Sequence, residues 1–95
     1  MISTKFNKFK KDFIEKANDD NIKELVENKK SNKQLNYIDT TNVTNMNHLF
    51  SISLFNGDIS QWNVSNVRNM SHMFYDSKFD GDISKWDVKK VIEIS

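Results

Sequence analysis

A stretch of the sequence recurs at a fixed spacing of 24 residues, and this repetition constrains the fold more than any other feature. The segment FNGDISQWNVSNV at residues 55–67 is followed by FDGDISKWDVKKV at residues 79–91. The same offset aligns NVTNMNHLF at residues 42–50 with NVRNMSHMF at residues 66–74. The repetition predicts a degenerate unit, a full unit and a partial unit at residues 31–54, 55–78 and 79–95.

Within each unit, the apolar pattern changes from the period of a strand to that of a helix. Trp62 and Val64 share one face at the strand period of two, and Ser65 with Asn66 marks a turn. The apolar residues of MSHMF at 70–74 then follow the spacing of a short helical turn. We therefore expect an α/β repeat fold, a short leucine-rich-type solenoid in which each coil stacks on the next. Its predicted core consists of Ile59, Trp62, Val64, Val67, Met70, Phe74, Phe79, Ile83, Trp86 and Val88.

The repeated unit also resembles a known family. The sequence FNGDISQWNVSNVRNMSHMF is similar to the repeat of BspA-type leucine-rich-repeat surface proteins, also called the mycoplasma lipoprotein repeat. The resemblance covers residues 39–91, in which Trp, Val, Val, Met and Phe recur in the family's order and spacing. It implies a bacterial or protist surface protein that takes part in adhesion and host contact.

Residues 1–30 do not match the repeat and are predicted to form a helical N-terminal cap. A first amphipathic helix is indicated by the spacing of Phe6, Phe9, Phe13, Ile14 and Ala17. A second, short helix is expected to carry Ile22, Leu25 and Val26. A cap is the preferred interpretation because the end coil of a solenoid must be covered. The alternative is a basic helix that contacts a membrane or an acidic partner.

The C-terminal unit ends in VIEIS, where apolar residues follow one another without a capping helix. Ile92 and Ile94 are therefore candidates for self-association through this end. A dimer, a chain that folds back and a longer array are the three alternatives that this pattern leaves open.

Two repeated polar features are candidates for binding sites. His48 and His72 occupy the same position in successive units, but two imidazoles are too few for a tight metal site. Asp58 and Asp82 each follow the glycine of NGD and DGD, yet the rest of a calcium loop is missing, so they are expected to bond turn amides. The chain contains no cysteine and no recognisable catalytic motif. We therefore expect no metal, no cofactor and no enzymatic activity.

The expected function is protein–protein binding or adhesion, with partner contacts made by exposed positions between the core residues. These candidate contacts are Gln61, Asn63, Arg68, Tyr75, Lys85 and Asp87. A net charge of +1 gives no attraction to nucleic acid, and no apolar run approaches the ~20 residues that a membrane helix needs. The alternative is an intracellular module that self-associates or binds an acidic partner. The resemblance implies the cell surface. A secretory signal, however, contains an uninterrupted apolar stretch, whereas lysines interrupt the apolar residues of this N-terminus. We therefore predict no location.

Overall fold

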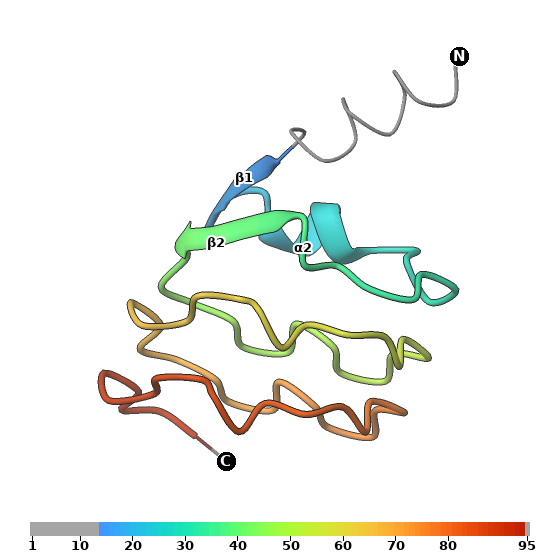
Figure 1. Cartoon of the computed structure of the whole chain (residues 1–95). Coiled ribbons are helices and arrows are strands. Elements are labelled where there is room, and N and C mark those ends of the chain that lie inside the picture. The colour runs from blue at the N-terminus through green and yellow to red at the C-terminus, as the bar shows by residue number, and fades with distance from the viewer. Residues whose placement is uncertain (1–13, 95) are drawn as a thin grey trace, which may run out of the picture.

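Two short strands and one short helix make up the regular secondary structure of residues 14–94, which are the residues that the computed structural model describes. Strand β1 spans Glu15–Asn18, helix α2 spans Ile22–Val26 and strand β2 spans Ile38–Asn42 (Figure 1). The two strands form a parallel sheet, in which the register shifts between Lys16 and Asn18. Within this described part, no helix is long and apolar enough to cross a membrane.

Helix α2 follows from the local sequence. Ile22 and Val26 lie four residues apart, so both side chains are buried on one face of the helix. The helix ends at Val26, and Asn28, two residues later, has a φ of 64°, a left-handed conformation that asparagine tolerates after a helix C-terminus. The second predicted helix is thus present as α2.

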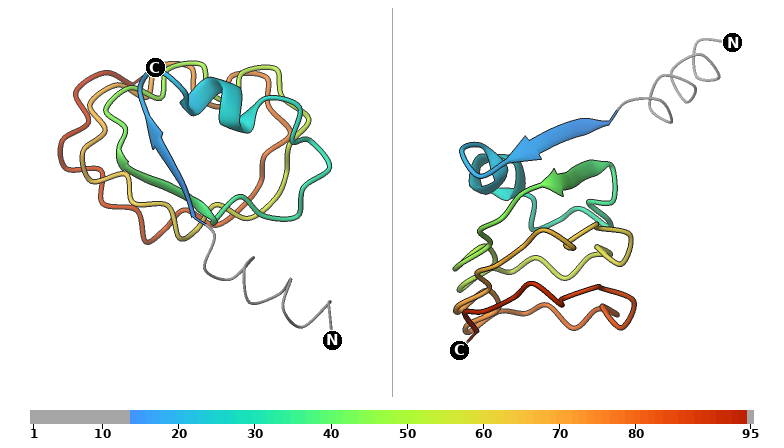
Figure 2. Two further views of the ribbon diagram at one scale, coloured as in Figure 1. Left: turned by 90° about the horizontal axis from the view of Figure 1, so that it is seen from above. Right: turned by 90° about the vertical axis from the view of Figure 1, so that its left-hand side faces the viewer.

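Below the sheet, the chain continues in irregular stretches that lie one beneath another (Figures 1 and 2). We call residues 31–54, which include β2, the first layer, residues 55–78 the second layer and residues 79–94 the third layer. The layers are joined by single parallel bridges, such as those that pair Asn45 with Asn69 and Asn69 with Glu93. The 24-residue spacing of the sequence therefore corresponds to hydrogen-bonded neighbours in adjacent layers.

The prediction of an α/β solenoid of leucine-rich type with a helical cap is wrong. A coil of that type carries a strand and a helix in each unit, whereas described residues 43–94 contain no regular strand and no helix. In the predicted first helix, Phe6, Phe9 and Phe13 lie outside the described residues, while Ala17 belongs to strand β1 and Ile14 precedes it.

The physical reason lies in how the backbone amides of the layers are used. The N–H groups of Phe50 and Ile52 donate across to carbonyls of the second layer at 2.8 and 2.7 Å. The N–H group of Ser51, which lies between them, donates to the carbonyl of His48, three residues earlier. This alternation leaves no run of helical hydrogen bonds and no continuous strand ladder. The helical turn predicted at residues 70–74 is replaced by the same series of tight turns, while the turn predicted at Ser65 and Asn66 is confirmed.

One hydrophobic core runs through the sheet, the helix and the layers. Residues Ala17, Ile22 and Val26 belong to the same buried cluster as Phe50 and Trp62. Equivalent aromatic rings stack from layer to layer in several columns: Phe50 on Phe74, Phe55 on Phe79, and Trp62 on Trp86. The predicted division of the chain into residues 1–30 and 31–95 stays a prediction.

Candidate protein-interaction surface

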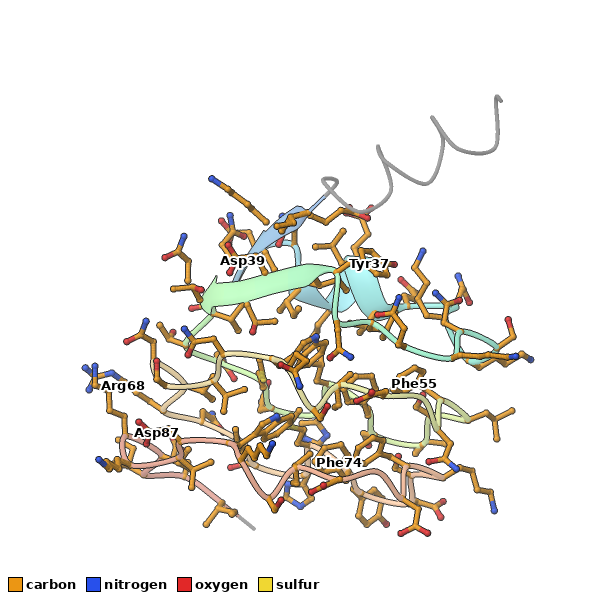
Figure 3. The ribbon with its side chains drawn as sticks, viewed as in Figure 1. Tyr37, Asp39, Phe55, Arg68, Phe74 and Asp87 are labelled. Atoms are coloured by element: carbon orange, nitrogen blue, oxygen red, sulfur yellow. The ribbon has the colours of Figure 1, made fainter. Side chains whose placement is uncertain are left out.

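The predicted partner contacts lie at the surface but do not form one patch. All six side chains are exposed: Gln61, Asn63, Arg68, Tyr75, Lys85 and Asp87. Gln61 and Lys85 border the same small hollow of 70 Å³, whereas Tyr75 borders a different and larger one. Arg68 and Asp87 lie toward one end of the layers in Figure 3. The structure therefore distributes these residues over several places.

Most of the predicted core residues are inside, and one is not. Ile59, Trp62, Val64, Val67 and Met70 are buried. Four further predicted core residues are half-buried against this core: Phe74, Phe79, Ile83 and Trp86. Val88 is 47% exposed, so its assignment to the core is wrong. Val88 belongs to the third layer, beneath which no described residue packs.

An apolar hollow lies against residues of the second and third layers, and we call it the lower hollow. Its volume is about 910 Å³, and its apolar lining includes Met70, Met73, Phe74, Ile83, Trp86 and Ile94. It is bordered by exposed Tyr75 and Val88 as well. Of the two candidate self-association residues, which are both 76% exposed, Ile94 lines the lower hollow and Ile92 does not.

Sequence reasoning did not identify His72 and Met73 as bordering this surface. Their spacing indicated only a repeated polar position and a core position. The hollow exists because the third layer does not cover all of the second layer. Residue types alone do not show where one layer overlaps the next.

The aspartates of NGD and DGD hold turns, as predicted. Asp58 Oδ1 accepts a hydrogen bond from the Ser60 amide at 2.8 Å, and Asp82 Oδ1 accepts one from the Ser84 amide at 2.9 Å. The Ser60 amide and hydroxyl hold the pKa of Asp58 below its ordinary value. The Ser84 hydroxyl and amide do the same to the pKa of Asp82. These carboxylates are already engaged by their own turns.

The two histidines meet face to face. The His48 and His72 rings are stacked with centroids 5.0 Å apart and an interplanar angle of 2°. Both residues have a positive φ, of 58° and 55°, so the backbone places them identically in the two layers. Within residues 14–94, no group of three or more His, Asp or Glu side chains is arranged to hold a metal ion.

Comparison with known proteins gives a family but no individual relative. The family described as "Mycoplasma protein of unknown function, DUF285" matches residues 20–95. No curated protein and no solved structure matches the chain. The match spans the helix, strand β2 and all three layers, including every residue that borders the lower hollow. The chain therefore belongs to the DUF285 family of Mycoplasma proteins of unknown function.

Proposed function

We propose that the chain is a non-enzymatic protein-binding module. The observation that carries this proposal is the lower hollow, which is lined by apolar side chains and has a volume of about 910 Å³ that no described residue fills. Tyr75, Val88 and Ile94 at its border are 59%, 47% and 76% exposed. Contiguous exposed apolar surface of this kind typically marks a site of contact with another molecule.

Adhesion at a bacterial surface is the setting that we propose for this binding. It is supported by the similarity of the repeated segment to the BspA-type surface proteins. The exposed polar residues Gln61 and Lys85, together with Asn63 and Asp87, would then make separate polar contacts, because none of them lines the lower hollow.

Site-specific photo-crosslinking tests the binding function. A photoreactive amino acid is placed at Ile94, which lines the hollow, or at Lys23, an exposed position on helix α2. After irradiation in an extract of the cells that make the protein, we expect a discrete polypeptide adduct from position 94 that position 23 does not give. The same adducts from both positions, or none from position 94, would contradict the proposal.

Self-association is the second candidate, and the exposure of Ile92 and Ile94 at the same end favours it. Light scattering of the wild type and of the double variant Ile92→Lys plus Ile94→Lys tests it. A wild-type dimer that becomes monomeric in the variant would support an interface between two copies. A monomer in both cases would leave a different polypeptide as the partner.

A further inference from the structure

The backbone edge above the lower hollow has a fully paired counterpart in the first layer. There, the N–H groups of Phe50 and Ile52 donate to the carbonyls of Met73 and Tyr75 at 2.8 and 2.7 Å. The carbonyl of Ser53 accepts a hydrogen bond from the N–H of Lys78 at 3.0 Å, which completes the pairing. The first-layer edge is therefore covered by the tight turns and loop of residues 73–78 of the chain itself.

In the second layer, the equivalent groups are those of Phe74, Asp76 and Ser77. Among the described residues, the N–H groups of Phe74 and Asp76 have no acceptor and the carbonyl of Ser77 has no donor. The pairing between layers does begin here, because the Met70 N–H donates to the Glu93 carbonyl at 2.8 Å. The open edge of residues 74–77 thus continues an interface that is already formed at Met70.

The side chains beside this edge indicate what fits there. In the first layer, Phe50 donates its N–H to Met73, and its ring stacks on that of the next residue, Phe74, at 5.9 Å with an interplanar angle of 2°. The outer face of Phe74 lines the lower hollow together with Met73 and Trp86. A segment that repeats this contact would place an apolar residue and then an aromatic residue against Phe74.

We propose that the edge of residues 74–77 and the lower hollow together bind a segment of a partner protein, which lies along this edge as residues 73–78 lie along the first-layer edge. The segment carries an apolar residue followed by an aromatic one. Its carbonyls accept from the Phe74 and Asp76 N–H groups, and one of its own N–H groups donates to Ser77. Its aromatic ring stacks on Phe74 inside the hollow. This mode of binding adds a backbone to an open edge and uses side-chain pockets for specificity. It rests on the protein-binding function proposed above and names the partner's chemistry.

The test uses a fluorescent peptide with the sequence of residues 69–79, NMSHMFYDSKF, because this segment covers the equivalent edge one layer above. Fluorescence anisotropy is measured as the whole protein is added. We expect saturable binding. A peptide with serine at both the Met73 and Phe74 positions should lose it. A peptide that is N-methylated at the Lys78 nitrogen should also bind more weakly, because it lacks the donor to Ser77.

The protein offers a matched pair of variants. Ile92 and Ile94 are equally exposed, at 76%, but only Ile94 lines the hollow. We expect Ile94→Asp to weaken peptide binding by about tenfold or more and Ile92→Asp to leave it nearly unchanged. Circular dichroism checks that both variants fold. Amide resonances of Phe74 and Asp76 should shift when the wild type binds the peptide.

Three results would overturn the proposal. They are an absence of saturable binding to the wild type, an equal loss in the two aspartate variants, and a wild-type dimer that Ile94→Asp dissociates, since the occupant would then be a second copy. If the peptide fails while photo-crosslinking from position 94 captures a partner, protein binding stands and the proposal of binding along the open edge falls. If the peptide binds but crosslinking from position 94 gives no adduct, the proposal that this protein binds a partner in the cell is contradicted.

Discussion

At the scale of single residues, Ile52 adopts a conformation that its side chain disfavours. Its φ is 58°, in the left-handed region, and the side chain is 68% exposed, so little packing offsets the strain. Left-handed backbone costs L-residues roughly 1–2 kcal/mol, and β-branched residues tolerate it worst. The equivalent second-layer residue, Asp76, has the same conformation with a φ of 50° and a side chain that tolerates it better.

We therefore predict that Ile52→Asn stabilises the protein by about 0.5–1 kcal/mol. Asparagine tolerates the left-handed region, and the hydrogen bond from the residue 52 N–H is kept. Ile52→Val, which stays β-branched, is the control and should give no gain. Urea denaturation of the three proteins measures the difference, and equal midpoints for Asn and Val would contradict this account of the strain.

Gly57 is needed because of close approach. A Cβ atom at this position would lie 2.6 Å from the carbonyl oxygen of Asn32 and 2.8 Å from the carbonyl carbon of Lys33. Both neighbours are backbone atoms and cannot move without shifting the first layer. Gly57→Ala should therefore destabilise the protein by about 1–3 kcal/mol.

Gly81 provides the comparison for Gly57 because it occupies the equivalent position in the third layer. A Cβ atom there would press on the ring of Phe79, at 2.6 Å, and would meet backbone only at 3.4 Å. Since the Phe79 side chain is only half-buried and can shift more easily than backbone, Gly81→Ala should cost less than Gly57→Ala in thermal unfolding. A larger loss for Gly81→Ala would show that the third layer is packed more tightly than the first.

At the scale of elements, a carboxylate joins the β1–α2 segment to the first layer. The amides of Thr44 and Asn45 both donate to Asp19 Oδ1, at 2.7 and 3.1 Å, and the Thr44 hydroxyl donates to Asp19 Oδ2 at 2.5 Å. In the second layer, two successive amides likewise share one acceptor, the Thr44 carbonyl. In the third layer, two successive amides share the Arg68 carbonyl. Asp19 thus takes the place of a backbone carbonyl above the first layer.

Asp19→Asn should destabilise the protein near neutral pH by about 1 kcal/mol, a value reduced for the exposure of the site. Burial raises the pKa of Asp19, but the hydrogen bonds from the Thr44 hydroxyl and amide and from the Asn45 amide outweigh it, so this pKa lies below the ordinary value of 3.8. A lowered folded-state pKa contributes stability that is present above the unfolded-state pKa and is lost as the pH falls through the folded-state pKa. The stability gap between wild type and variant should therefore close below about pH 4.

Asp20→Asn is the matched control for this pH experiment because it removes the same charge from the adjacent position. Among the described residues, the Asp20 carboxylate makes no hydrogen bond of its own. Thermal unfolding from pH 3 to pH 7 should show a gap that closes for Asp19→Asn and little effect for Asp20→Asn. A constant gap for Asp19→Asn would mean that its carboxylate does not gain stability by ionising.

The sequence patterns predicted burial better than they predicted elements. The alternation of Trp62 and Val64 with Gln61 and Asn63 correctly separates buried from exposed side chains. It does not produce a strand, because only isolated bridges join the layers. Helix α2 was predictable because its four-residue spacing is local. The open edge at Phe74 was not, since it depends on which backbone amides meet the layer below.

At the scale of the whole molecule, the layers differ in how much backbone they protect. The first layer, which includes β2, lies between strand β1 and the second layer, and the N–H groups of Phe50 and Ile52 are bonded between layers. The equivalent groups of Phe74 and Asp76 have no acceptor among the described residues. Because amide exchange requires the hydrogen bond to open, this difference should appear as a gradient of protection along the stack.

We predict that, after correction for intrinsic rates, the amides of Phe50 and Ile52 exchange at least about 100-fold more slowly than those of Phe74 and Asp76. Hydrogen exchange followed residue by residue with NMR measures this at low protein concentration. The two pairs occupy equivalent positions in their layers, so the difference in exchange rate reports the effect of the covering layer. Equal protection that persists on dilution would contradict an open edge. Protection of Phe74 and Asp76 that rises with protein concentration would instead assign the covering of this edge to a second copy.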